Sequence, residues 1–228
     1  MTAQWVAEAV GGRLVADPEV TVMSVVRDSR EAGPGALYVA LPGERADGHD
    51  FVEGAALRGA VLHLVSRSVD RPHVLVSDCT KALGLLAREY LRTLREAGRP
   101  TVIGVTGSVG KTTTKDLLSQ ILPGVVVPVG SYNNEIGLPL TVLRAKDTTE
   151  NLVLEMGANG VGHIAYLCGI APPDVAVVLT IGSAHLGEYA SMDELTRTKA
   201  EIITGSLDGA MVVLNADDPR VAAMASLA

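Results

Sequence analysis

Aromatic and sulfur-containing side chains are scarce in this sequence. Aromatic residues make up 3% of the 228 residues, and cysteine occurs twice. A core with so few rings must be built from Val, Leu, Ile and Ala. Cys79 and Cys168 are far apart and have no neighbouring pattern of metal ligands. We therefore expect two buried free thiols, and the spacing excludes a zinc site of the usual type.

Long apolar runs and an excess of positive charge are also missing. The longest apolar run, Val175 to Ile181, has the length of a strand, whereas a membrane-spanning helix needs ~20 residues. Residues 1–14 lack a basic segment followed by an apolar run, so we expect no secretory signal there. The net charge of -7 argues against broad nucleic-acid binding. We expect a cytoplasmic monomer without a membrane span or a nucleic-acid partner.

The first 80 residues predict a small α/β domain. Short apolar segments typical of strands occur at residues 20–26, 36–41, 61–65 and 74–76, and helices are expected at 5–10 and 51–58. A longer amphipathic helix is expected at 81–97, where leucines recur at helical spacing. We place the domain boundary just before this helix, which gives domains of residues 1–80 and 81–228.

Residues 81–228 show a regular alternation of strands and helices. Strands rich in Val and Ile are expected at 102–105, 125–129, 152–156, 175–181 and 211–214, and helices at 112–121, 138–144, 164–168 and 192–203. This alternation predicts a mostly parallel sheet with helices on both faces. In such sheets ligands bind at the carboxyl ends of the strands.

A glycine-rich segment joins the strand at 102–105 to the following helix. It consists of Thr106, Gly107, Ser108, Val109, Gly110, Lys111, Thr112 and Thr113. A glycine-rich turn between a strand and a helix is the context of a phosphate-binding loop, or P-loop. Its backbone N–H groups and the helix N-terminus would bind phosphate, Lys111 would reach the terminal phosphates of ATP, and Thr112 would bind Mg²⁺.

The match to the general P-loop pattern is a variant. That pattern places a glycine where this chain has Val105, and Gly107 lies inside the loop instead. The alternative is a strand-to-helix turn that binds nothing. Gly-Lys-Thr-Thr at this junction is hard to explain by packing alone, which favours the phosphate-binding interpretation.

Three further polar residues follow the strands of this predicted sheet. Glu155 ends one strand, His185 follows the next, and Lys199 lies on the subsequent helix. A carboxylate at a strand end beside a P-loop is well placed to bind magnesium. Taken alone, the same residues could be a solvated carboxylate, a structural histidine and an exposed lysine.

The sequence from Thr106 to Lys115 resembles the P-loop of the Mur ligases and their folylpolyglutamate synthetase relatives. Ser108, Lys115 and the segment Asn133-Asn134-Glu135-Ile136-Gly137-Leu138-Pro139 are most similar to the branch that adds D-alanyl-D-alanine. This resemblance extends from about Trp5 to Pro219. One departure is His163, where that branch usually has an acidic residue.

The resemblance implies an ATP-dependent amide ligase that acts through an acyl phosphate, with ATP and Mg²⁺ as cofactors. Its substrates would be UDP-N-acetylmuramoyl-tripeptide and D-alanyl-D-alanine. The residues that match catalytic positions are Lys111, His185 and Lys199. Magnesium would be held by Thr112, Glu155, His185 and a carbamoylated Lys199, since carbamoylation turns a cation into an oxygen ligand.

The same resemblance assigns the N-terminal domain to the uridine nucleotide. The motifs are Asp28-Ser29-Arg30 and the segment at 43–51. Substrate-binding residues would be Ser29, Arg30, Arg45, Asp47, His49, Asn133 and Asn134. Arginine suits a diphosphate because its planar fork donates two parallel hydrogen bonds. Turn residues and surface ion pairs are the alternative for each of them.

Family members continue into a third domain with further ATP contacts, so the resemblance implies a truncated chain whose activity alone is in question. Two other functions stay open. One is a related ligase for a different carboxylate or amine, which a substrate panel would identify. The other is a non-catalytic module that binds UDP-linked precursors or ATP.

Overall fold

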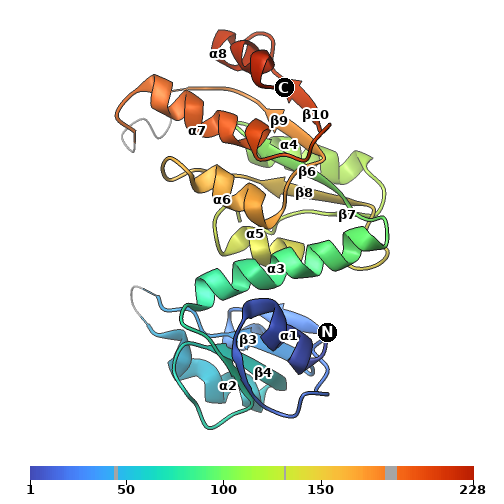
Figure 1. The fold of residues 1–228 in the computed structure, drawn as a ribbon, viewed down its shortest axis with the longest axis vertical. Helices are drawn as coiled ribbons and strands as arrows, with labels where there is room; N and C mark the ends of the chain where they lie inside the picture. Colours follow the sequence, from blue (N-terminus) through green and yellow to red (C-terminus); the bar gives the residue numbers. More distant parts are fainter. Residues whose placement is uncertain (44–45, 131, 183–188) are drawn as a thin grey trace. The chain divides into compact units, whose positions relative to one another are not determined.

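The computed structural model describes residues 1–43, 46–130, 132–182 and 189–228, and the chain divides into two compact units (Figure 1). Unit 1 is Met1–Tyr90 and unit 2 is Leu91–Ala228. The division falls inside helix α3 (Cys79–Glu96), the long helix expected at 81–97. Within the described part of the chain, every helix is too short or too polar to traverse a bilayer.

Unit 1 contains a five-stranded sheet in the order β1-β5-β4-β3-β2. Strands β1 and β5 pair antiparallel, and the other neighbouring strands of this sheet, as far as the structure describes them, pair parallel. The strands are β1 (Arg13–Val15), β2 (Ser24–Val26), β3 (Ala36–Val39), β4 (Ala60–Val65) and β5 (His73–Leu75). The helices are α1 (Ala3–Val10), α2 (Val52–Leu57) and the 3-10 turns η1 (Ser29–Glu31) and η2 (Gly48–Phe51).

Local signals account for the ends of α1. The hydroxyl of Thr2 accepts a hydrogen bond from the Trp5 amide, and Gly11 ends the helix in the left-handed conformation at φ 62°.

Strand β2 is shorter than expected from residues 20–26, because the Val22 amide donates to the carbonyl of Met1 and Thr21 forms an isolated bridge with Thr2. The N-terminal segment therefore takes the place of a longer β2.

Unit 2 contains a five-stranded, all-parallel sheet in the order β10-β9-β6-β8-β7. Its strands are β6 (Thr101–Thr106), β7 (Val125–Val126), β8 (Asn151–Glu155), β9 (Val175–Val178) and β10 (Met211–Leu214). Its helices are α4 (Lys111–Ile121), α5 (Gly137–Val142), α6 (His163–Ile170), α7 (Met192–Thr204), α8 (Pro219–Ala222) and the 3-10 helix η4 (Ala223–Leu227). The predicted parallel α/β architecture is confirmed.

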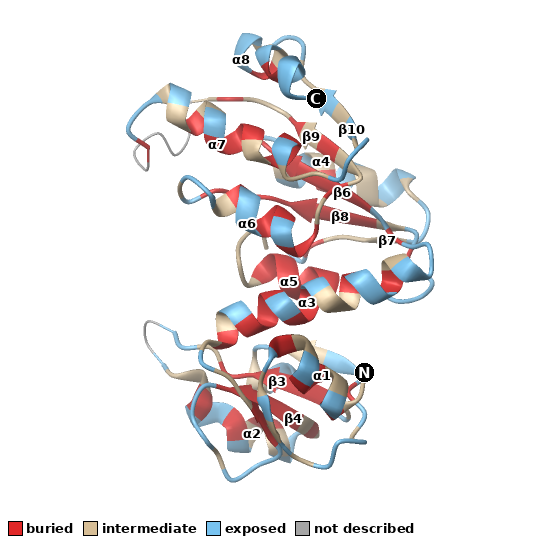
Figure 2. Cartoon of the chain, in the orientation of Figure 1, coloured by how far each residue is buried: buried red, intermediate tan, exposed pale blue. Residues whose placement is uncertain are grey.

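The central strands of unit 2 are covered on both faces. Every residue of β6 after Thr101 is buried, as are the last four residues of β8 (Figure 2). Gly104 of β6 is required for this packing, because a Cβ there would lie 2.8 Å from the Pro173 ring and 3.1 Å from Ile202 of α7. The small residue lets the helix approach the sheet closely.

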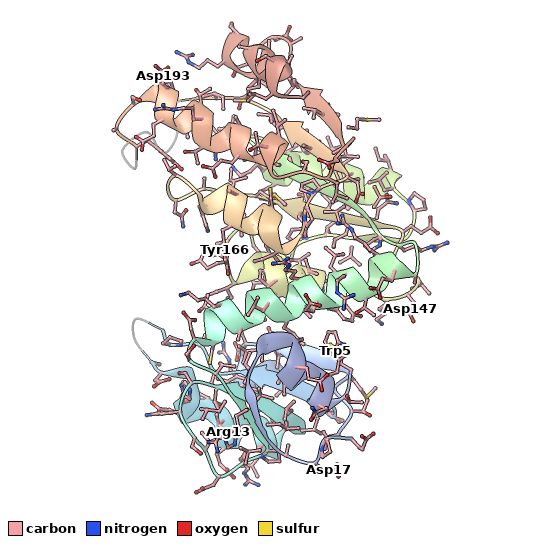
Figure 3. The ribbon with its side chains drawn as sticks, viewed as in Figure 1. Trp5, Arg13, Asp17, Asp147, Tyr166 and Asp193 are labelled. Atoms are coloured by element: carbon pink, nitrogen blue, oxygen red, sulfur yellow. The ribbon has the colours of Figure 1, made fainter. Side chains whose placement is uncertain are left out.

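Helix α7 begins with strong sequence signals. The Ser191 hydroxyl accepts from the Glu194 amide, and the Glu194 carboxylate accepts from the Ala190 amide. This pairing resembles a capping box. Asp193, at the start of α7 in Figure 3, adds a second negative charge at the positive end of the helix dipole.

Cys79 and Cys168 are buried and form no disulfide, as expected.

Candidate nucleotide site at the end of the parallel sheet

The glycine-rich loop follows β6 and leads directly into α4. Gly107 (φ 150°) and Gly110 (φ 92°) both adopt backbone conformations that favour glycine. A Cβ at Gly107 would also lie 3.0 Å from the Cβ of Leu179 and 3.2 Å from the Thr180 amide nitrogen. Both glycines are therefore needed for the tight turn that brings the loop to the N-terminus of α4.

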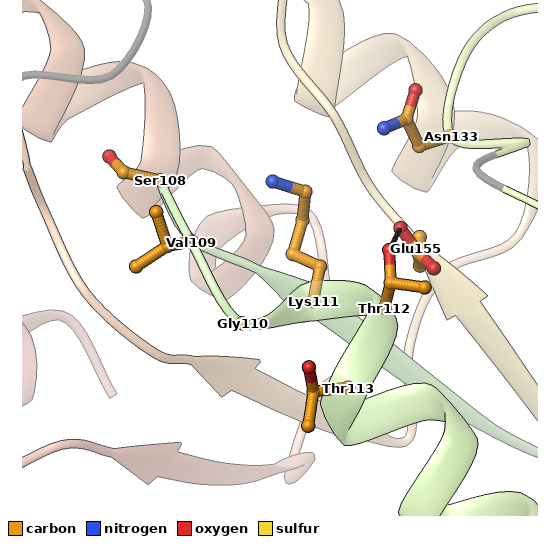
Figure 4. Close-up of a pocket in the computed structure, with 8 residues that line it drawn as sticks. All are labelled: Ser108, Val109, Gly110, Lys111, Thr112, Thr113, Asn133 and Glu155. Carbon is orange, nitrogen blue, oxygen red and sulfur yellow. Dashed lines mark hydrogen bonds between the residues drawn. The ribbon is translucent and has the colours of Figure 1, made fainter.

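A cavity of about 300 Å³ opens at this turn (Figure 4). Its lining consists of Ser108, Val109, Gly110, Lys111, Thr112, Thr113, Asn133 and Glu155. The first six come from the loop and the first turn of α4, whereas Glu155 ends β8 and Asn133 comes from the segment before α5. The fold thus brings together the P-loop, the strand-end carboxylate and the asparagine segment, as the parallel sheet predicts.

Lys111 lies half-buried at the start of α4. Its ammonium group donates a hydrogen bond of 2.7 Å to the carbonyl of Gly107. Burial lowers the pKa of Lys111, and the nearby Glu155 carboxylate opposes that shift. The lysine therefore folds back across the loop, at the place where a bound phosphate would offer it a stronger partner.

Glu155 is the most unusual group in the cavity because it is a buried carboxylate with an unsatisfied oxygen. Only 1% of the residue is exposed. Its Oε2 is 3.4 Å from the Thr112 hydroxyl, and its Oε1 has no hydrogen-bond partner among the described residues. Burial raises the pKa of Glu155, while the Thr112 hydroxyl and the ammonium groups of Lys115 and Lys111 lower it. Such a group needs a cation or a donor to offset its desolvation.

The Thr112 and Glu155 side chains fit a magnesium ion. Both offer the hard oxygen atoms that Mg²⁺ prefers, and a cation would satisfy the orphaned Oε1 of Glu155. In the described ranges no three His, Cys, Asp or Glu side chains form a metal-binding group. A metal ion at this position would therefore need the Thr112 hydroxyl and phosphate oxygens as ligands in addition to the Glu155 carboxylate.

Thr106 and Ser108 use their hydroxyls to hold neighbouring loops. The Thr106 hydroxyl donates to the carbonyl of Met156 at 2.8 Å, directly after β8. The Ser108 hydroxyl donates to the carbonyl of Gly182 at 3.2 Å and accepts from the Gly182 amide at 2.9 Å, beyond β9. Both side chains are buried, and they tie the P-loop to the loops that follow the two adjacent strands.

Asn133 and Asn134 are adjacent but lie in different surroundings. Asn133 lines the cavity, and its carbonyl accepts from the Gly157 amide at 2.9 Å. The side-chain oxygen of Asn134 accepts from the amides of Ile136 and Gly137 at the start of α5. Asn134 therefore shapes the segment that presents Asn133.

The proposed second metal site can be located only in part. Lys199 lies on α7 and is 4% exposed, so it is not the solvated lysine that its sequence position alone would suggest. It does not line the cavity described above. His185 lies outside the described residues. The pairing of these two residues stays a prediction.

Ser29, Arg30 and His49 lie in the 3-10 turns that follow β2 and β3, and Asp47 immediately precedes the second turn. The exposed Arg30 pairs with Asp28 at 2.6 Å, and hydrogen bonds from Arg30 lower the pKa of Asp28 to about 2. Ser29 begins the same turn, η1. Arg45 lies outside the described residues.

Hydrogen bonds connect the buried His49 with the partly exposed Asp47 and with Ser66, an exposed residue that follows β4; we call this group the His49 clamp. The Ser66 amide donates to His49 Nε2 at 2.9 Å, so the Nδ1–H of the neutral ring donates to Asp47 at 2.6 Å. Both ring nitrogens of His49 are thus engaged within unit 1. This geometry fits a residue that holds the turn η2 in place better than one whose ring contacts a ligand.

Sequence reasoning missed two polar contacts near the cavity. His163 of α6 binds the Glu135 carboxylate, and Glu201 of α7 accepts hydrogen bonds from backbone amides at the start of α6. Neither contact has a sequence motif, because its partners lie 28 to 39 residues apart. The unusual residue type at position 163 was the only available signal.

Comparisons with known proteins match both units. Residues 105–228 match the family described as "Mur ligase middle domain", and residues 21–91 match "Mur ligase family, catalytic domain". A Mycobacterium tuberculosis protein named "UDP-N-acetylmuramoyl-tripeptide--D-alanyl-D-alanine ligase" is 44% identical over 257 residues, covering 100% of this chain and 50% of that protein. A Bacillus subtilis protein of the same name is 40% identical over 230 residues, covering 96% and 49%.

Solved structures show the same likeness. MurF from Acinetobacter baumannii superposes with a TM-score of 0.88 at 33% identity, covering 99% of this chain and 51% of that one. MurF ligase from Thermotoga maritima, in complex with ADP, has a TM-score of 0.79 at 42% identity, covering 89% and 48%. The chain spans about half the length of the relatives it matches. On the evidence of its P-loop site and the family match over residues 105–228, this chain belongs to the Mur ligase family.

Proposed function

We propose that this chain carries the nucleotide-binding and UDP-precursor-binding parts of an ATP-dependent ligase. That ligase would join D-alanyl-D-alanine to UDP-N-acetylmuramoyl-tripeptide in peptidoglycan precursor synthesis, as a cytoplasmic monomer. The observation that carries the proposal is the cavity in which Lys111, Thr112 and the orphaned Glu155 carboxylate face one another. The names of the relatives and the ADP in the Thermotoga complex support the choice of reaction and nucleotide.

In this proposal unit 2 binds ATP through the P-loop. Backbone N–H groups from Gly107 to Thr112 and the N-terminus of α4 surround the phosphates. Lys111 exchanges its bond to the Gly107 carbonyl for one to the terminal phosphates. Burial of the lysine strengthens that contact, because charge interactions are less screened away from water.

The chemistry then proceeds in two transfers. The terminal carboxylate of the tripeptide attacks the γ-phosphorus, the bond to the β-phosphate oxygen breaks, and an acyl phosphate and ADP form. The amine of D-alanyl-D-alanine next attacks the acyl carbon, loses a proton to solvent or a base, and inorganic phosphate leaves. Lys111 positions and neutralises the transferred phosphoryl group, which is the main task of a protein in such reactions.

Thr112 and Glu155 would hold a magnesium ion beside the phosphates, which would offset the repulsion between ATP and the attacking carboxylate. We further propose that carbamoylated Lys199 and His185 hold a second one. Carbamoylation joins CO₂ to the neutral amine with release of a proton, and it gives a buried lysine the oxygen ligands that magnesium requires.

Unit 1 is proposed to bind the uridine diphosphate part of the precursor at the edge where η1 and η2 follow their strands. Ser29, Arg30 and Arg45 are the candidates for direct contact, while Asp47 and His49 connect the start of η2 to Ser66. Functionally we assign residues 1–80 to the precursor and 81–228 to the nucleotide. We also assign Asn133, which lines the nucleotide cavity, and the adjacent Asn134 to substrate binding.

Calorimetric titration of the chain tests this proposal. We expect saturable binding of UDP-N-acetylmuramoyl-tripeptide that is tighter than that of UMP, and separate binding of ATP in the presence of Mg²⁺. Binding of ATP with no binding of the precursor would contradict the assignment of unit 1. A panel of UDP-linked precursors ending in other residues would then identify a different ligase of the same family.

A further inference from the structure

The N-terminus of α6 is fixed by side chains from two other parts of unit 2. One side chain comes from the segment before α5, which carries Asn133, and the other comes from α7, which carries Lys199. We call His163, Glu135, Glu201 and the loop 157–162 the α6 junction. The loop follows directly after Glu155 and Met156 at the end of β8.

His163 connects two loops through a defined tautomer. Its Nδ1 accepts a hydrogen bond from the Asn159 amide at 3.2 Å. Because that nitrogen accepts, the proton of the neutral ring must be on Nε2, which donates to the Glu135 carboxylate at 3.1 Å. The imidazole thus bridges the loop after β8 and the segment that contains Asn133.

The Asn133 side of this bridge is tightly packed. The Gly157 amide donates to the Asn133 carbonyl at 2.9 Å, and a Cβ at Gly157 would lie 2.8 Å from the Asn133 side-chain carbon. The loop backbone therefore rests directly on the side chain that lines the nucleotide cavity. A shift of this loop would move Asn133 as well as the backbone next to Glu155.

Glu201 fixes the other side of the junction. Its two carboxylate oxygens accept from the amides of Gly162 at 2.7 Å and Ala165 at 3.0 Å. These amides belong to the first turn of α6, where no side chain of α6 itself provides a cap. A carboxylate at this position also interacts favourably with the helix dipole. Because Glu201 is two residues after Lys199, the contact ties the Lys199 helix to the loop after Glu155.

We propose that His163 and Glu201 are positioning residues: His163 holds Asn133 in place beside Glu155, and Glu201 holds the Lys199 helix against the loop that follows β8. Neither residue lines the cavity, so their effect on ligands passes through the loop backbone and through Glu135. The inference rests on the proposed function in one respect, because its binding test uses a nucleotide with Mg²⁺ as the ligand. Removal of groups that orient metal ligands commonly weakens metal binding by about 10- to 100-fold.

The test measures how much Mg²⁺ strengthens the binding of a non-hydrolysable ATP analogue. We expect His163→Ala and Glu201→Ala each to reduce this gain by about tenfold. The affinity without metal should stay unchanged, because the P-loop backbone supplies it. Arg197→Ala, an exposed change on the same helix as Glu201, is the matched control and should leave both affinities as they are. An unchanged Mg²⁺ gain in both folded variants would overturn the proposal.

Charge exchange at the His163–Glu135 contact sharpens the test. His163→Glu places two carboxylates together and should lose the Mg²⁺ gain. In the double variant His163→Glu with Glu135→Gln, the amide can donate to the new carboxylate, so the gain should return. His163→Gln should behave like the original chain, since its amide can accept from Asn159 and donate to Glu135. Failure of both rescues would contradict the role given to this contact.

Hydrogen exchange separates the junction from the proposed function. In His163→Ala the Gly157 amide, which donates to Asn133, should exchange faster even without nucleotide. If the original chain binds no nucleotide, the proposed function fails, and the exchange rate of Gly157 still decides the inference. Faster exchange supports the bridge to Asn133, and an unchanged rate overturns it.

Discussion

In both units the candidate residues lie at or after the carboxyl ends of parallel strands. The units differ in whether the polar groups at these positions have hydrogen-bond partners. In unit 1, η1 and η2 follow the carboxyl ends of β2 and β3, and in unit 2 the P-loop and Glu155 follow β6 and β8. At the candidate positions of unit 1, polar groups pair with one another, as in the Arg30–Asp28 pair and the His49 clamp. In unit 2 the buried Glu155 keeps an oxygen without a partner. A buried carboxylate with an unsatisfied oxygen inside a cavity calls for a cation or a donor, whereas the paired groups of unit 1 define the shape of its turns.

The largest expected effect is the loss of the P-loop lysine. Lys111→Ala should weaken ATP binding about 10- to 100-fold, because it removes a charge-assisted hydrogen bond to phosphate from a partly buried site. Binding of the UDP-linked precursor to unit 1 should not change. Calorimetry with each ligand would measure both, and Lys146→Ala, an exposed lysine of unit 2, is the control. Equal losses for both ligands would show that the units do not bind separately.

The next largest effect concerns the stability of unit 2 alone. Gly104→Ala should lower the free energy of unfolding by about 1–3 kcal/mol, because the added Cβ meets the Pro173 ring at 2.8 Å. Gly169→Ala is a matched control within α6, where a Cβ meets nothing within 4 Å, and it should stabilise by about 0.5 kcal/mol.

Hydrogen exchange in β6 would report the stability of unit 2 in these variants. The fluorescence of the single tryptophan, Trp5, would report unit 1, where we expect no change. A shift of the Trp5 transition in Gly104→Ala would contradict the independence of the two units.

Periodicity and turn chemistry were sufficient to predict the sheet of unit 2 and the P-loop. Val- and Ile-rich segments marked its strands, and Gly107 and Gly110 marked the turn. The rule that ligands bind at the carboxyl ends of parallel strands then predicts that Glu155 lies beside the P-loop.

Contacts between distant segments could not be predicted in the same way. Ser108 lies in the predicted loop and lines the cavity, but nothing in the sequence indicates that its hydroxyl bonds to Gly182, 74 residues away. Glu201 sits in an ordinary helical sequence, and its function at α6 depends on how two helices pack. Strand β1 has three residues and no periodic signal, so it was missed. Such features follow from tertiary structure, which overrides local propensity.

The smallest effect expected is a pH dependence confined to unit 1. His63 of β4 is fully buried, its Nδ1 bonds to the Pro72 carbonyl at 2.9 Å, and its Nε2 has no partner among the described residues. Burial lowers the pKa of His63 below its usual 6.5, with smaller contributions from Arg71 and His73, while the Pro72 carbonyl and Glu53 oppose the shift. The unfolded chain therefore binds a proton more readily than the folded one.

The neutral His63 ring therefore contributes fully to the stability of unit 1 above about pH 6.5, the pKa of the unfolded chain. This contribution is lost as the pH falls through 6.5 toward the lowered pKa of the folded state. We expect the Trp5 unfolding midpoint to fall between pH 7.5 and 5.5, and His63→Gln to flatten this dependence, because glutamine does not titrate and can still donate to the Pro72 carbonyl. His163→Gln in unit 2 should leave the Trp5 profile unaltered. A profile that His63→Gln leaves unaltered would contradict the role given to His63 in the acid sensitivity of unit 1.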